Sequence, residues 1–170
     1  MRKVLLIIAA IILAGCAIKE VEQMGDLKLA SPAFENKGMI PAKYTCDGDD
    51  INPELLVDGI PKEAKSLVLI MDDPDAPVGT WDHWILFNVP LVSKIGENSV
   101  PGGAIQGTNS FRKLDYGGPC PPSGTHRYMF KLYALDKMLD LDEGADKSEV
   151  EAAMEGHIIA QTKLTGLYKR

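Results

Sequence analysis

Residues 117–128 read Gly-Gly-Pro-Cys-Pro-Pro-Ser-Gly-Thr-His-Arg-Tyr, and this stretch decides the fold. Seven of its first nine residues are Gly, Pro or Ser, which excludes a helix or a central strand there. The chain then runs without a break into residues 128–135, whose alternating side chains predict a strand. One face of that strand is shared by His126, Tyr128, Phe130, Leu132 and Ala134.

A rigid turn that leads directly into a strand delivers His126 and Tyr128 side by side to the end of a sheet. Such a pair of polar side chains can form one wall of a small polar pocket. The simpler interpretation is a Pro-rich hairpin turn, in which His126 is solvated or hydrogen-bonded within its own loop. The segment alone leaves both interpretations open.

The composition places the stretch in one globular domain. The chain has 170 residues and is 45% hydrophobic, which is enough for a sizeable core. Its formal charge of −6 and the lack of a basic stripe argue against nucleic acid as a partner. With 16 Gly and 11 Pro, and with strand patterns more evident than helix patterns, the sequence predicts a mainly β fold with many turns.

The first residues predict an export signal. Arg2 and Lys3 precede an apolar run over residues 4–13, and small residues close the run before Cys16. About ten apolar residues are too few to span a hydrocarbon core of roughly 30 Å. The pattern resembles the lipobox, at which cleavage leaves a lipid-modified cysteine. The alternative is a plain secretory signal with a chance cysteine.

The lipobox interpretation divides the chain into three parts. Residues 1–15 are the lipoprotein signal peptide, residues 16–26 are a tether, and residues 27–170 are the folded domain. We therefore expect an exported protein that a lipid on Cys16 holds on a membrane of the cell envelope.

The other two cysteines are Cys46 and Cys120. In an exported protein such a pair favours a disulfide over two free thiols. The sequence contains no Cys-x-x-Cys spacing, so it does not support a zinc ribbon.

A second group of polar residues follows a predicted buried strand. Residues 66–71 form a continuous apolar run that is short enough for a strand buried on both faces. Asp72, Asp73 and Asp75 come directly after it, so this edge of the sheet is expected to be polar. The alternative is a loop of simply solvated acids.

The next predicted strand, residues 81–89, begins with another histidine. Alternation places Trp81 and His83 on one side of it, and Asp82 and Trp84 on the other.

One helix is predicted, beginning near Ser148 with a Ser148-x-x-Glu151 capping box. Gly166 breaks the pattern, and a short strand is expected after it. The apolar face of the helix would be made by Val150, Ala153, Met154, His157, Ile158 and Gln161.

Three segments together indicate a family. They are residues 73–77 (Asp-Pro-Asp-Ala-Pro), residues 81–84 (Trp-Asp-His-Trp) and residues 117–128, with their Gly-Pro-Cys-Pro-Pro and His-Arg-Tyr parts. In order and spacing they resemble the phosphatidylethanolamine-binding protein family, in the bacterial and archaeal branch described as Raf-kinase-inhibitor-like. Residues 44–53, with Tyr-Thr-Cys-Asp-Gly and Asn-Pro, fit as well, and the likeness spans about residues 27–170.

The resemblance implies a fold of two antiparallel sheets with a short C-terminal helix. It also implies a small anion pocket that accepts phosphate-like groups. Residues 55–57 depart from the pattern, because they lack the tryptophan that often follows the Asn-Pro segment. Carried over residue by residue, the pocket would contain Asp73, Pro77, Trp81, His83, Gly118, Pro121, Pro122, His126 and Tyr128.

Three functions are compatible with these residues. The first is a non-catalytic module, without a cofactor, that binds phosphate-bearing small molecules or phospholipid headgroups. The second is a phosphoester hydrolase that uses His83, His126 and Asp73, with Ser123 or Cys120 as the nucleophile, although no Gly-x-Ser-x-Gly elbow exists. The third is a metal site made by the same three residues. The sequence names neither the ligand nor a protein partner, and leaves open whether the domain forms a homodimer.

The carboxylate of Asp73 is expected to act on whichever histidine it contacts. Its charge would favour the imidazolium form and raise the pKa of that histidine above about 6.5. The histidine would then donate a charge-assisted hydrogen bond to a phosphate oxygen.

The lipid anchor leads to the first prediction. Replacing the acceptor thiol, in Cys16→Ser, should move the protein from the membrane fraction to the soluble fraction, because no lipid can then be attached. Cell fractionation measures this, and Cys46→Ser is the matched control. A Cys16→Ser protein that stays on the membrane would show that residues 4–13 are an anchor helix.

Overall fold

The computed structural model describes residues 26–170, and the predicted signal peptide and Cys16 lie outside the described residues. A 3-10 turn, Ala42–Tyr44, is the only helical element besides α1 in this part of the chain. The strands and the helix, in chain order, are β1 (Lys28–Ala30), β2 (Gly38–Met39), β3 (Leu55–Asp58), β4 (Ser66–Asp73), β5 (Trp81–Val89), β6 (Lys94–Ile95), β7 (Ile105–Gln106), β8 (Thr125–Leu135), α1 (Lys147–Met154) and β9 (Ile158–Lys169).

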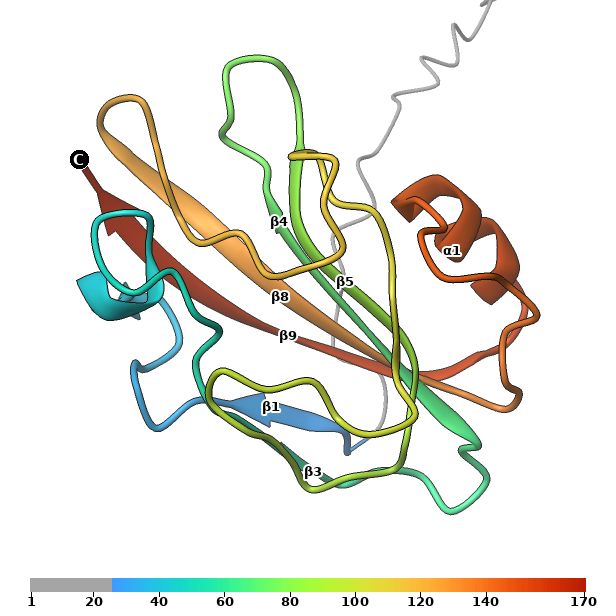
Figure 1. The fold of residues 1–170 in the computed structure, drawn as a ribbon. Helices are drawn as coiled ribbons and strands as arrows, with labels where there is room; N and C mark the ends of the chain where they lie inside the picture. The colour runs from blue at the N-terminus through green and yellow to red at the C-terminus, as the bar shows by residue number, and fades with distance from the viewer. Residues whose placement is uncertain (1–25) are drawn as a thin grey trace, which may run out of the picture.

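Two sheets confirm the predicted mainly β fold. The larger sheet has the strand order β2-β9-β8-β4-β5-β7, and the smaller has the order β1-β3-β6. All pairs are antiparallel except β2 with β9, which is parallel. Figure 1 shows the long diagonal strands of the larger sheet, with β1 and β3 on one side and α1 on the other.

β4 lies inside the larger sheet and is buried on both faces. Leu67, Leu69 and Met71 of β4 pack in the core between the two sheets. Val68 and Ile70 of β4 face the second core, where Val150 and Met154 of α1 pack. Every residue of β4 is buried, as its unbroken apolar run predicts. On β8, Tyr128, Phe130, Leu132 and Ala134 all join the first core, which confirms their predicted common face.

The C-terminal part corrects the sequence prediction. The helix is capped by Asp146 instead of Ser148, in a reciprocal capping box with Glu149, and it ends at Met154. Gly156 has φ 78°, which ends the helix, and the chain then forms β9. The expected helical continuation through His157, Ile158 and Gln161 is therefore wrong. Ala160, Thr162 and Leu164 are buried in alternation along β9, which is the period of two that a strand produces. The helical propensity of the residues before them hid this period in the sequence.

A disulfide joins Cys46 to Cys120, with their Cα atoms 5.5 Å apart. Hydrogen bonds reinforce it. The Cys46 amide donates to the Pro119 carbonyl over 3.2 Å, and the Gly118 amide donates to Asp50 Oδ1 over 2.7 Å. The Tyr116 hydroxyl also donates to the Tyr44 carbonyl over 2.8 Å. The 117–122 loop is thus fixed by several links besides the covalent one.

Within residues 26–170, no helix is long and apolar enough to cross a membrane.

The disulfide gives the second prediction. It spans 74 positions of sequence, for which the chain-entropy model allows a stabilisation of about 4.5 kcal/mol at most. The Cys46→Ser/Cys120→Ser double variant should lose roughly 2–4 kcal/mol in urea unfolding yet keep its fold, because the hydrogen bonds of the loop remain. An unchanged unfolding free energy, or alkylation of both thiols in the native oxidised protein, would contradict this.

Candidate functional site

Four polar side chains meet where β4, β5 and β8 end or begin. They are Asp73 at the end of β4, His83 near the start of β5, and His126 and Tyr128 at the start of β8. All four residues are at least nine-tenths buried. We call these four residues the histidine cluster.

A β-bulge brings His83 into the histidine cluster. Met71 pairs with Trp84 and Asp72 pairs with Asp82, so His83 is an extra residue in β5. Trp84 consequently packs in the core between the sheets, on the same side as His83. Strict alternation had placed Trp84 on the side of Asp82, and that prediction is wrong because the bulge interrupts the period of two.

Hydrogen bonding fixes the tautomer of His83. Its Nδ1 lies 2.6 Å from the Gly117 carbonyl, which can only accept, so Nδ1 carries the proton. Burial lowers the pKa of His83, although the Gly117 carbonyl and the charge of Asp73 act in the opposite direction. The charge of Asp73 thus acts on the pKa of His83 in the expected direction, but desolvation outweighs it; the expectation itself concerned the histidine that Asp73 contacts.

Asp73 contacts His126 instead. His126 Nδ1 lies 2.7 Å from Asp73 Oδ2, and the carboxylate can only accept, so this nitrogen donates. Asp73 Oδ1 accepts from the Asp75 amide over 2.8 Å. Both oxygens of Asp73 are thus occupied, and the role that this geometry leaves to Asp73 is to orient His126.

The loop after β4 is clamped onto β8 by an ion pair. Asp75 Oδ2 accepts from the amide and from Nε of Arg127, each over 2.9 Å, and Asp75 Oδ1 accepts from Nη2 over 2.7 Å. The hydrogen bonds from the Arg127 side chain lower the pKa of Asp75. Sequence reasoning treated Asp75 as one acid among three; only the β4–β8 pairing shows its partner.

Tyr128 carries a buried hydroxyl that has no hydrogen-bond partner among the described residues. Its ring meets that of His83 edge to face, with centroids 5.2 Å apart. Burial raises the pKa of Tyr128 and the charge of Asp73 adds to the effect, whereas the nearby Cys120 backbone acts in the opposite direction. The hydroxyl therefore remains protonated and is a neutral donor. The indole Nε1 of Trp81 is likewise buried without a partner in the described chain.

Phe111, which sequence reasoning did not single out, covers the histidine cluster. Its ring lies edge-on to His83 and to Trp81, with centroids 5.4 Å apart in both cases. Asn109 holds this loop in place, because its Oδ1 accepts from the amides of Phe111 and Lys113. The segment has no hydrophobic periodicity, so the sequence offered no signal for its position.

The remaining predicted site residues form the surroundings. A Cβ at Gly118 would overlap Asp50 and Tyr44, so the loop needs glycine there. Pro121 is buried beside this loop, whereas Pro77 and Pro122 are exposed. No hydrogen bond or ring contact in the described chain joins these prolines to the histidines.

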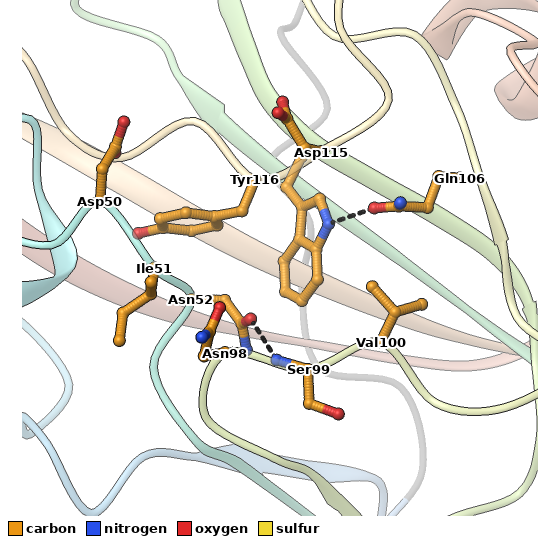
Figure 2. Close-up of a pocket in the computed structure, with 10 residues that line it drawn as sticks. Asp50, Ile51, Asn52, Asn98, Ser99, Val100, Gln106, Asp115 and Tyr116 are labelled. Atoms are coloured by element: carbon orange, nitrogen blue, oxygen red, sulfur yellow. Dashed lines mark hydrogen bonds between the residues drawn. The ribbon is translucent and has the colours of Figure 1, made fainter.

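A concave feature lies apart from the four residues of the histidine cluster, none of which lines it. It is a cleft of about 310 Å³ between the 98–100 segment and Tyr116. The Trp84 indole lines this cleft and donates to Gln106 Oε1 over 3.3 Å. Figure 2 shows Gln106, Tyr116 and the 98–100 segment around it. The mouth carries the carboxylates of Asp50 and Asp115, and no basic side chain lines the cleft.

In residues 26–170, no group of three or more His, Cys, Asp or Glu side chains is placed to hold a metal ion. Two imidazoles and a phenol give the histidine cluster groups for hydrogen bonding and for proton exchange.

Comparison with known proteins places this geometry in a family. The model of the phosphatidylethanolamine-binding protein family matches residues 30–169. A UPF0098 protein of Methanothermobacter thermautotrophicus is 53% identical over 150 residues, which are 85% of this chain and 99% of the relative. A UPF0098 protein of Pyrococcus horikoshii is 47% identical in an alignment of 175 positions, gaps included, that covers 97% of this chain and 88% of the relative.

Two solved structures share the fold. One is a putative phosphatidylethanolamine-binding protein homologue from Chlamydia trachomatis, with a TM-score of 0.82 and 44% identity over 85% of this chain and 97% of that one. The other is E. coli YbcL, described as a new member of the mammalian family, with a TM-score of 0.79 and 28% identity over 85% of this chain and 98% of that one. Together with the family match over residues 30–169, these likenesses show that the chain belongs to the phosphatidylethanolamine-binding protein family.

Proposed function

We propose that this chain is a non-catalytic binding protein for phosphate-bearing small molecules or phospholipid headgroups, and that the histidine cluster binds the phosphate. The observation that carries the proposal is that three polar groups of the cluster have no partner among the described residues: the Nε2 atoms of the two histidines and the Tyr128 hydroxyl. Each histidine uses Nδ1 within the protein, and no described residue bonds to either Nε2. The Tyr128 hydroxyl lies beside them without a partner. A phosphate, with several acceptor oxygens, suits this set of potential donors.

Each member has a distinct role in this proposal. A protonated His83 or His126 donates a charge-assisted hydrogen bond from Nε2, and Tyr128 donates a neutral one. Asp73 does not bond to the phosphate, because both groups are anionic acceptors; its oxygens accept from His126 Nδ1 and the Asp75 amide instead. Burial strengthens these interactions, because a site shielded from water has a lower effective dielectric constant.

We further propose that the protein is exported and anchored through lipid on Cys16. The main support is the short apolar run that ends in Leu-Ala-Gly before Cys16. The disulfide between Cys46 and Cys120 supports it, because such bonds persist in oxidising compartments.

A phosphoester hydrolase is the alternative, and one observation favours it. The carboxylate of Asp73 orients His126. Enzymes that use a nucleophile and a general base orient the base with a third group in the same way. A nucleophile is missing from the described contacts, however. Cys120 is in a disulfide, and Ser123 is exposed and makes no hydrogen bond to either histidine. The geometry thus favours binding over turnover.

The roles of the two histidines give the third prediction. His83→Ala and His126→Ala should each weaken binding of phosphate or phosphoethanolamine by about ten- to a hundredfold, the cost of one charge-assisted hydrogen bond. His157→Ala is the matched control and should bind like the parent, because His157 pairs with Asp136 elsewhere. Titration calorimetry measures the affinities. Unchanged binding in both cluster variants would place the ligand elsewhere, and phosphoester turnover lost in either would favour the hydrolase.

The fourth prediction concerns pH. The anion prefers protonated His83, and burial lowers the pKa of this histidine in the free protein. Affinity should therefore rise as pH falls below about 6.5, and binding at neutral pH should take up a proton. Sulfate, whose charge is constant from pH 5 to pH 8, is the probe; calorimetry in buffers of different ionisation heats counts the protons. Affinity that increases steadily towards alkaline pH would contradict this.

A further inference from the structure

Behind the histidine cluster, on the opposite face of the larger sheet, four charged side chains are packed together. Lys147 Nζ lies 2.9 Å from Asp72 Oδ2 and 2.8 Å from Asp82 Oδ1, and Lys131 Nζ lies 2.6 Å from Asp72 Oδ2. The Asp72 side chain is only 1% exposed, and the two lysines are each 17% exposed. We call these four residues the ion network.

The ion network is formally neutral but depends on both lysines. Asp72 and Asp82 are directly paired neighbours in the sheet, so their like charges repel unless cations lie between them. Lys147 is the one side chain that bonds to both carboxylates. Burial disfavours its charge, but Asp72 and Asp82 outweigh burial and raise the pKa of Lys147, so it stays charged. Asp72 Oδ1 is buried and has no hydrogen-bond partner among the described residues, so the charge of this carboxylate is stabilised only through Oδ2.

The ion network is joined to the histidine cluster by adjacent residues. Asp72 precedes Asp73 on β4, and Asp82 precedes the bulged His83 on β5. The backbone of Asp82 is fixed in both directions, because its amide donates to Ser110 Oγ and its carbonyl accepts from the Ser110 amide, each over 2.9 Å. Lys147 is the first residue of α1, which lies beside β5 (Figure 1). It therefore fixes the side chain of Asp82, the residue next to the bulge.

The charges of the ion network also reach His83 through the sheet. Burial and the Gly117 carbonyl have the largest effects on the pKa of His83. The next are the carboxylates of Asp73, Asp72 and Asp82, all of which favour the protonated form. The elements around His83 carry these titratable and charged groups: Asp72 and Asp73 on β4, Asp82 on β5, His126, Tyr128 and Lys131 on β8, Lys147 on α1, and Arg112, Lys113 and Asp115 on the Phe111 loop.

We propose that Lys147 is a positioning residue for His83, which acts through Asp72 and Asp82 from the far face of the sheet and sets the pH range in which the histidine cluster takes up an anion. It holds the two strand ends in register at the bulge, and it cancels the negative charge behind the imidazole. With Lys147 in place burial keeps the pKa of His83 below its ordinary value, so an anion that arrives near neutral pH would bring a proton with it. The anion part of this inference rests on the proposed function; the charge coupling does not.

The test is a double-variant cycle on the complete chain, read by the imidazole resonances of its three histidines. Lys147→Met keeps the apolar stem but removes the cation, so the midpoint of the His83 titration should rise by about half a unit to one unit. Asp82→Asn removes one of the carboxylates and should lower that midpoint. The double variant should lie near the parent. His157 is the internal control. Lys62→Met is the control variant, because Lys62 is exposed and makes no ion pair within residues 26–170.

The proposal is supported if the midpoint of the His83 titration rises in one single variant and falls in the other. A purely structural role would move both midpoints in the same direction or leave both unchanged. Shifts in the same direction, or none, would overturn it. Should Lys147→Met not fold, Asp82→Asn still decides, since an unchanged His83 midpoint in that variant is an overturning result. Sulfate affinity near neutral pH should rise about three- to tenfold in Lys147→Met. If sulfate binds no variant, the proposed function fails while the resonances still decide the charge coupling.

Discussion

The arrangement of the site depends on one irregular pairing, the bulge that inserts His83 into β5 opposite Met71 and Asp72. A regular strand would direct His83 and Trp84 to opposite faces of the sheet. The bulge lets Trp84 fill the core between the sheets while His83 still meets Tyr128 and the Gly117 carbonyl. One extra residue thus satisfies both the packing of the larger sheet and the polar contacts at its edge. Bulges recur next to functional sites because they redirect a side chain in this way.

The end of β4 separates two electrostatic environments across a single sheet. Asp73 faces the histidines, whereas Asp72, one residue earlier, faces two lysines. Buried charges of this kind are tolerated only when they are paired, and here each face supplies its own partners. Since adjacent residues on a strand point in opposite directions, two consecutive aspartates serve two sites that do not touch. The apolar strand before them holds both carboxylates rigidly in place.

Much of this arrangement could be predicted from the sequence, for identifiable reasons. The apolar run of β4 and the Gly- and Pro-rich turn before His126 are local signals, and they indicated a mainly β fold with polar residues at a sheet edge. The length of β9 was missed because Ile158 and Gln161 also fit a helical period, and only pairing with β8 settles the conflict. The bulge, Phe111 and Lys147 could not be found, since each depends on contacts between segments far apart in the sequence and has no local pattern.

The covalent connection between Cys46 and Cys120 has a consequence for how the site is assembled. Under oxidising conditions the unfolded chain is already a ring that contains β3, β4, β5, β6 and β7, with β8, α1 and β9 outside it. In the folded sheet β8 lies between β4 of the ring and β9 of the tail, so the tail has to dock along one edge of the ring. Asp73 and His83 belong to the ring, whereas His126 and Tyr128 belong to the tail. The histidine cluster therefore draws its residues from both sides of the covalent ring, and it is complete only when β8 has paired with β4.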